Sequence, residues 1–165
     1  YEFCDWYLEI AKPVLQSETA TEAQKRGTRR TLVHTLEALL RALHPLMPFI
    51  TEEIWQRVAP LAGRTAESVM LESLPEAATG TQDSGVEAEM KWVMDFIVGI
   101  RNIRGEMDIA PSKRFDVVLA NASSTDLERL ARTRHYVERL AGVNAVRPLD
   151  AGEAEPDAAV ALLGE

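Results

Sequence analysis

The sequence has one cysteine, Cys4, among its 165 residues, so no disulfide can form within the chain. It also lacks an apolar run of the roughly 20 residues that a membrane-spanning helix needs, and we expect no membrane partner. No secretion leader is visible, and Tyr1 falls within a helical pattern rather than at an initiator methionine. These absences predict a cytoplasmic protein segment that belongs to a longer chain.

Residue sets that support catalysis are missing as well. The three histidines and the cysteine do not have the spacing of metal ligands. The glycines form no phosphate-binding loop, and no nucleophile stands beside a base. The adjacent carboxylates Glu52 and Glu53 fall near a helix start, where the helix dipole already accounts for them. We therefore expect no catalytic residue, no metal and no cofactor in this chain.

Apolar residues repeat at three- and four-residue steps through the first 105 residues, as in amphipathic helices. The expected helices span residues 1–15, 21–43, 48–58 and 84–105. Pro13 and Pro45 mark the ends of the first two, because proline lacks the backbone N–H that continues a helix. We expect an antiparallel helical bundle over residues 1–106, with a short extended piece at 69–71.

Residues 107–165 predict a different structure, a small appendix of order β-α-β-β. Its expected strands are rich in residues suited to sheets and span residues 115–120, 143–149 and 158–163. Thr125 and Glu128 have capping-box spacing for the intervening helix, which Gly142 should end, and Ser84 and Glu87 have it for the helix before. The expected fold class is therefore mainly α, a helical bundle followed by a small α+β appendix.

Charge is distributed unevenly along the chain. The formal net charge of −8 disfavours a simple nucleic-acid binder, because phosphate contacts need a basic surface. Basic residues nevertheless gather between residues 25 and 41, including Arg29 and Arg30. A second cluster surrounds one predicted helix end and consists of Arg101, Arg104, Lys113 and Arg114. Four cations are more than the helix dipole requires at one end. The cluster is therefore either a solvated charged surface or a contact with RNA, and the sequence does not choose between the two.

Aromatic residues make up only 6% of the chain, and most of them stand at helical spacing, where core packing is the usual role. The aromatics at such positions are Phe3, Trp6, Tyr7, Phe49, Trp55, Trp92 and Phe96. Trp6 and Tyr7 are adjacent, so they cannot both face the same core. The more exposed of the two is our candidate for stacking on an unpaired RNA base.

Three motifs resemble one family of enzymes. LHPLMPFITEEIWQRV (residues 43–58) resembles a corner of the anticodon-binding helical domain that valyl-, isoleucyl- and leucyl-tRNA synthetases share. FCDWYLEIAKP (residues 3–13) resembles the helix that opens that domain. IRNIRGEMDIAPSK (residues 100–113) is similar to the valyl form, and the order of FDVVLA and AVRPLD after it is similar to the small domain that follows in valyl enzymes.

The resemblance implies a parent ligase that joins valine to its tRNA with ATP and magnesium. Catalysis would belong to another domain of the same parent chain, since the HIGH and KMSKS signatures are absent here. This segment would hold the anticodon stem-loop of valine tRNA, as a monomer and without chemistry of its own. The coiled coil that typically ends valyl enzymes is also absent from these residues.

The residues that would touch the tRNA follow from the charge pattern. Arg101, Arg104, Lys113 and Arg114 would contact the anticodon loop, Arg29 and Arg30 would steer the stem, and Trp6 or Tyr7 would help to read the anticodon. Two alternatives stay open. The segment could be a structural or protein-interaction module that packs on the catalytic body, or the equivalent domain of an isoleucyl or leucyl enzyme.

Overall fold

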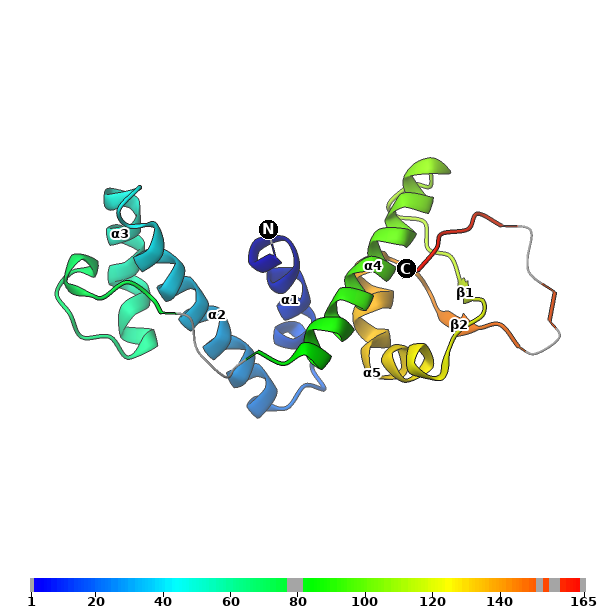
Figure 1. Ribbon diagram of the computed structural model, residues 1–165, viewed down its shortest axis with the longest axis horizontal. Helices are drawn as coiled ribbons and strands as arrows, with labels where there is room; N and C mark the ends of the chain where they lie inside the picture. The colour runs from blue at the N-terminus through cyan, green and yellow to red at the C-terminus, as the bar shows by residue number, and fades with distance from the viewer. Residues whose placement is uncertain (1, 77–81, 151–152, 155–157, 164–165) are drawn as a thin grey trace. The chain divides into compact units, whose positions relative to one another are not determined.

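The computed structural model describes residues 2–76, 82–150, 153–154 and 158–163 (Figure 1). Contacts divide the chain into two compact units, Tyr1–Thr81 and Gln82–Glu165. The structure is mainly helical with one small sheet, which confirms the expected fold class. The expected boundary at residue 106 remains a prediction about domains; the division by contacts falls earlier, and groups residues 84–106 with those that follow.

The described part of the first unit contains helices joined by loops, and no strand. Its elements are a π-helical turn η1 (Glu2–Tyr7), α1 (Leu8–Gln16), α2 (Glu22–Leu43), α3 (Pro48–Val58) and the short 3₁₀ helices η2 (Ala59–Ala62) and η3 (Val69–Leu71). α1 and α3 each pack against α2. The first helix was expected over residues 1–15 with its end near Pro13, and α1 continues past that proline to Gln16. Pro13 is buried, so packing of its ring offsets the one backbone hydrogen bond that it removes.

α2 begins where the sequence predicts it. The Thr21 hydroxyl accepts a hydrogen bond from the Gln24 N–H at 3.2 Å, and the Gln24 side chain accepts one from the Thr21 N–H at 2.8 Å. This reciprocal capping box satisfies two backbone donors that a helix start otherwise leaves unpaired. Pro48 opens α3 at its first position, where a missing N–H has no cost, also as expected.

The core of the first unit lies between α2, α3 and the two 3₁₀ helices. Its buried members are Leu40, Trp55, Ala59 and Val69. The expected extended piece at residues 69–71 is wrong, because this segment forms η3. The Glu52 carboxylate accepts hydrogen bonds from the Ser68 hydroxyl at 3.0 Å and from the Val69 N–H at 3.1 Å, which folds the backbone back towards α3.

The second unit combines two helices with a two-stranded sheet. Its elements are α4 (Ser84–Glu106), β1 (Val117–Leu119), α5 (Ser124–Ala141) and β2 (Val146–Pro148). β1 and β2 are parallel, with Val117 opposite Val146, and α5 is the crossover that a parallel pair requires. α4 and α5 pack on each other. The buried residues are Trp92, Val93, Phe96, Ile97 and Ile100 from α4, and Leu130, Thr133, Val137 and Ala141 from α5.

Three details of the second unit differ from expectation. Asp83, not Ser84, caps α4, with its carboxylate accepting from the N–H groups of residues 85 and 86 at 2.9 and 3.1 Å. Ser123 with Asp126, rather than Thr125 with Glu128, forms the capping box of α5. The cap must sit on extended backbone one residue before the helix, and Ser123 has that conformation, with ψ at 165°. Gly142 ends α5 in the left-handed conformation, φ 68°, as predicted.

The expected third strand, residues 158–163, is not a strand in the described structure. Ala161 lies beside Gly99 of α4, 3.4 Å from where a β-carbon on that glycine would be. Val160 and Leu162 are exposed. A strand needs a neighbouring strand to satisfy its backbone groups, whereas this segment passes over a helix and has no such partner there. None of the described helices is long and apolar enough to cross a membrane.

Candidate nucleic-acid interface

The basic cluster at the end of α4 is assembled in the second unit, and Arg104 is its centre. Its guanidinium donates four hydrogen bonds, two from each terminal nitrogen, at 2.8 to 3.1 Å. The acceptors are the backbone carbonyls of Ala110, Lys113, Ala141 and Gly142. The same guanidinium lies 4.9 Å from the centre of the Phe115 ring, a cation–π distance. Arg104 therefore ties α4 to the following turn and to the end of α5.

Two further arginines also donate to carbonyls at or just beyond the end of α5. Arg101 donates to the carbonyl of Leu140 at 3.2 Å, and Arg114 donates to the carbonyl of Val143 at 3.1 Å. We call Arg101, Arg104 and Arg114 the arginine clamp. The last carbonyls of a helix have no partner within the helix and carry partial negative charge, so cations stabilise them. The structure thus brings the sequence-predicted cluster together, around a backbone target that the sequence does not reveal.

The members of the cluster differ in how much they expose. Arg104 is half-buried, whereas Arg101, Lys113 and Arg114 are exposed. The Lys113 carbonyl accepts from Arg104, but its side chain extends from an exposed turn. The corner can therefore present positive charge to a ligand while Arg104 holds its backbone in place.

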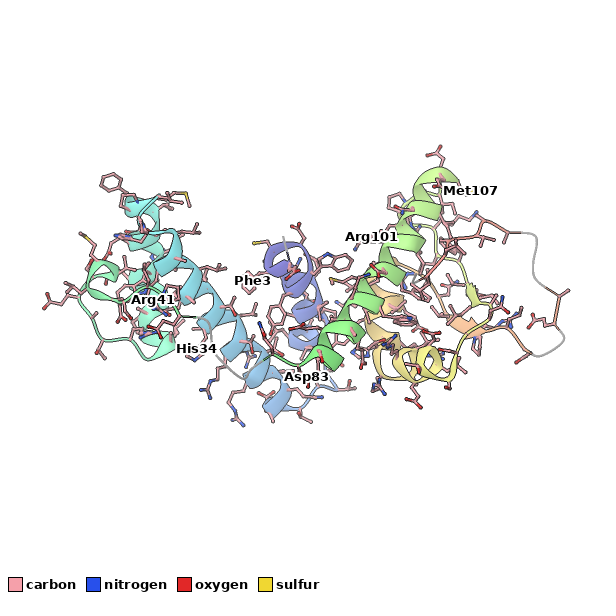
Figure 2. All side chains as sticks on the ribbon, in the orientation of Figure 1. Phe3, His34, Arg41, Asp83, Arg101 and Met107 are labelled. Carbon is pink, nitrogen blue, oxygen red and sulfur yellow. The ribbon has the colours of Figure 1, made fainter. Side chains whose placement is uncertain are left out.

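A second basic surface lies in the first unit, between α2 and η2. Its α2 members stand at positions i, i+3, i+4, i+7 and i+8 and therefore share one helix face. This basic groove is lined by Arg26, Arg29, Arg30, Val33, His34, Leu61, Ala62 and Gly63. It is an open hollow of about 660 Å³, and Figure 2 labels His34, one of its lining residues, on α2. Arg29 and Arg30 were predicted as tRNA contacts. Arg26 was part of the same basic run without being assigned a contact, and His34 was expected to be structural, although helical spacing places all four on one face.

The arginines of the basic groove differ from those of the clamp in their partners. In the described part of the chain, Arg26, Arg29 and Arg30 make no ion pair or side-chain hydrogen bond. Glu22, the acidic residue of the first turn of α2, lies 3.7 Å from Lys25 instead. The three guanidinium groups are exposed and have unused donors.

The wall of the basic groove is anchored to α2 by a buried ionic network. Arg41 donates to both oxygens of the Glu37 carboxylate, at 2.8 and 3.1 Å, and the Trp55 indole N–H donates to the same group at 3.1 Å. Arg64, directly after Gly63, reaches Glu37 at 3.3 Å. We call these four side chains the Glu37 network. It joins α2, α3 and the segment after η2.

Electrostatics explain why Glu37 tolerates a position where only 1% of its surface is exposed. Burial by itself raises the pKa of a carboxyl group, but hydrogen bonds from Arg41 and Trp55 and the charges of Arg41 and Arg64 outweigh it. The pKa of Glu37 is therefore lowered from its ordinary value, and the side chain is ionised.

The aromatic candidates are only partly distinguished by the structure. Trp6 and Tyr7 are both half-buried, and the Tyr7 ring stacks on Phe3 at 5.8 Å between ring centres. Trp55, Trp92 and Phe96 are buried, which confirms their expected core role. For Phe49 that expectation is wrong, since 90% of its surface is exposed. Thr51 and Trp55 define the buried face of α3, and Phe49 lies two residues before Thr51, on the other side of the helix.

No group of three metal-ligating side chains comes together in the ranges that the structure describes. His44 has a structural partner, the Thr51 hydroxyl, at 2.8 Å. The family model of the anticodon-binding domain of tRNA ligase matches residues 1–119. That range contains the basic groove and all four cations at the end of α4. The chain belongs to this family of anticodon-binding domains of tRNA ligases.

Proposed function

We propose that this chain is the part of a valine–tRNA ligase that binds and positions the anticodon stem-loop of valine tRNA. The observation that carries tRNA binding is membership of the anticodon-binding family over residues 1–119. Valine specificity rests on the resemblance of residues 100–113 to the valyl form. These same residues include Arg101 and Arg104 of the arginine clamp, so the distinguishing motif coincides with a basic surface.

Within the proposal, the cations at the end of α4 divide their work. Arg101, Lys113 and Arg114 are exposed and would contact phosphates or unpaired bases of the anticodon loop. Arg104 would mainly hold the corner, because four carbonyls already accept from it. Arg29 and Arg30 would contact the stem, and Trp6 or Tyr7, each half-buried, would offer a ring face to a base.

The rest of the proposal concerns the parent protein. It would use ATP and magnesium to activate valine in a catalytic domain of the same chain, while this segment contributes no catalytic residue. We place that protein in the cytoplasm and treat it as a monomer. In this proposal, the activation of valine with ATP and magnesium involves none of the side chains described above.

One observation favours a second function. Leu46, Met47, Phe49 and Ile50 form a run of exposed apolar residues at the corner between α2 and α3. Contiguous exposed apolar residues commonly mark sites of contact with another protein surface. A structural module that packs on the catalytic body would use such a surface. The equivalent domain of an isoleucyl or leucyl enzyme is the third candidate.

A gel-shift comparison of anticodon stem-loops tests the three candidates. We expect the chain to bind the valine stem-loop more tightly than the isoleucine and leucine stem-loops, with affinity that falls as salt rises. Tighter binding of another stem-loop would assign the domain to that enzyme. No binding to any stem-loop at low salt would support the structural module instead.

The residue assignment at the end of α4 needs its own variants. Arg101→Gln combined with Lys113→Gln should weaken valine stem-loop binding by about tenfold or more, because two phosphate contacts are lost. The same loss should lower the salt dependence of binding. Lys12→Gln combined with Lys91→Gln removes the same charge from cations that pair with Glu9 and Asp95, and should change binding little. Equal effects of the two pairs would overturn the assignment.

A further inference from the structure

We infer that the basic groove of α2 is a docking site for the ribose–phosphate backbone of RNA, used without regard to base sequence. The inference rests on the proposed function, tRNA binding. It adds Arg26, His34 and the η2 wall to the two arginines that the sequence suggests, and assigns the groove a chemical class of ligand.

The shape of the groove comes from α2 and η2. Residues 26, 29, 30, 33 and 34 form one face of α2, and Leu61–Gly63 stand opposite. Gly63 has φ 75°, and no atom outside its immediate neighbours lies within 4 Å of where its β-carbon would be. The hollow is therefore open along that side, which suits a polymer that passes through rather than a small molecule that must be enclosed.

Charge selects an anionic occupant. Arg26, Arg29 and Arg30 come within five positions of one another on a chain with a net charge of −8, yet none of the carboxylates in the described ranges lines the groove. Like charges placed together without a counter-charge repel one another. An external anion relieves this repulsion, and guanidinium groups bind phosphate oxygens through paired donors.

The apolar residues of the groove favour a nucleotide over a bare anion. Val33 is half-buried, and 72% of the surface of Leu61 is exposed. These side chains offer van der Waals contact to a ribose ring between two phosphates, while His34, which is exposed, adds a hydrogen-bonding group. Free phosphate would use the arginines alone.

The groove is held open by the Glu37 network. Arg64 follows Gly63 and is fixed by Glu37 at 3.3 Å and by Glu72 at 3.2 Å. Glu37 belongs to α2, so the two walls are tied to each other by an ion pair. A site whose walls are already in place loses less conformational entropy on binding.

The test compares two triple variants of the whole chain that remove equal charge. Arg26→Gln/Arg29→Gln/Arg30→Gln empties the groove of guanidinium groups. Lys12→Gln/Arg57→Gln/Lys91→Gln is the matched control, because each of those exposed cations pairs with a carboxylate on its own helix. Circular dichroism and thermal melting establish that both variants keep the wild-type fold. Binding of valine, isoleucine and leucine stem-loops is then measured over a series of potassium chloride concentrations.

We expect the groove variant to lose about two to three units of slope in log K against log salt, since three phosphate contacts contribute roughly 0.7 to 0.9 each. The affinity loss at 0.1 M salt should be tenfold or more and equal for all three stem-loops, because backbone contacts carry no sequence information. The control variant should keep the wild-type slope to within about half a unit.

Each other outcome overturns the inference. Wild-type binding with equal slopes in both variants would remove the groove from the interface and leave the proposed function standing. A loss confined to one stem-loop would make the groove a sequence reader. RNA binding that is equal in the two variants, with sodium phosphate raising the melting temperature of the control variant alone, would assign the groove to a small anion. Absence of wild-type binding at low salt would end both the inference and the proposed function.

Discussion

The arginine clamp and the basic groove are both sets of arginines at helical spacing, yet they differ in what accepts their hydrogen bonds. In the clamp, the guanidinium groups of Arg101, Arg104 and Arg114 donate to the backbone carbonyls of residues 140–143 and of the turn after α4. In the groove, three exposed guanidinium groups have no acceptor in the described chain. Spacing thus predicts which cations share a face, whereas a distant helix end decides which of them stabilise the fold.

α2 shows the same contrast along its own length. Arg29 and Arg30 are exposed, whereas Arg41, three turns later, is buried and pairs with Glu37. A buried charge without a partner is strongly destabilising, so Arg41 and Glu37 depend on each other. Substitutions along this one helix should therefore separate stability from RNA binding.

The largest expected effect belongs to the Glu37 network. Glu37→Gln should lower the free energy of unfolding of the first unit by about 3 kcal/mol, because it leaves Arg41 buried without a counter-charge. Glu53→Gln is the control, since its pair with Arg57 is exposed, and it should cost less than about 1 kcal/mol. Amide hydrogen exchange in α2 and α3 reports the stability of this unit. Similar losses of unfolding free energy in both variants would show that the buried pair of Glu37 and Arg41 stabilises the unit no more than an exposed pair does.

The arginine clamp should give the next largest effect. Arg104→Ala removes four hydrogen bonds to carbonyls and should destabilise the end of α5 by about 2 kcal/mol. Arg104→Lys should recover little, because an ammonium group cannot reach two pairs of acceptors with one rigid fork. Faster amide exchange at residues 138–143 measures the effect. Arg132→Ala, which removes an exposed partner of Glu89, should leave those amides unchanged, and an equal acceleration there would contradict the clamp.

The sequence predicts the helical face of each cluster but not its target. The resemblance and the periodicity give the helices, the fold class and the positions of Arg29, Arg30, Arg101 and Arg104. Most of the carbonyls that accept from the clamp lie at residues 140–143, at the end of α5 and just beyond it, and no local pattern links them to Arg101 and Arg104. Residues 158–163 were expected to form a strand because their composition suits one, yet composition does not supply a neighbouring strand. Phe49 was expected in the core because it occupies a helical position, but the buried face is fixed by Thr51 and Trp55.

A fall in pH should weaken the stabilising contribution of the Glu37 network, whereas the arginines of the basic groove stay charged. The pKa of Glu37 is lowered in the folded chain: burial raises it, and the hydrogen bonds and charges of its arginine and tryptophan neighbours more than offset that. A lowered folded pKa means that the carboxylate stabilises the fold above its ordinary pKa and loses this contribution as pH falls through the lowered value. Stability of the first unit should therefore decline as pH drops below about 4.5, and decline less in Glu37→Gln. Parallel pH profiles of the two proteins would contradict this.

The smallest changes in stability make the sharpest comparison between folding and binding. Thr21→Ala removes the side-chain cap of α2 and should cost about 1 kcal/mol without changing the salt dependence of RNA binding. Arg29→Gln should do the reverse: its side chain has no partner among the described residues, so stability changes by less than about 0.5 kcal/mol, while the salt slope falls by roughly 0.7 to 0.9. Thermal melting and stem-loop titration over a salt series measure both quantities on the same samples. If Thr21→Ala lowers the slope as much as Arg29→Gln, the groove acts on RNA only through the stability of α2, and its arginines are not contacts.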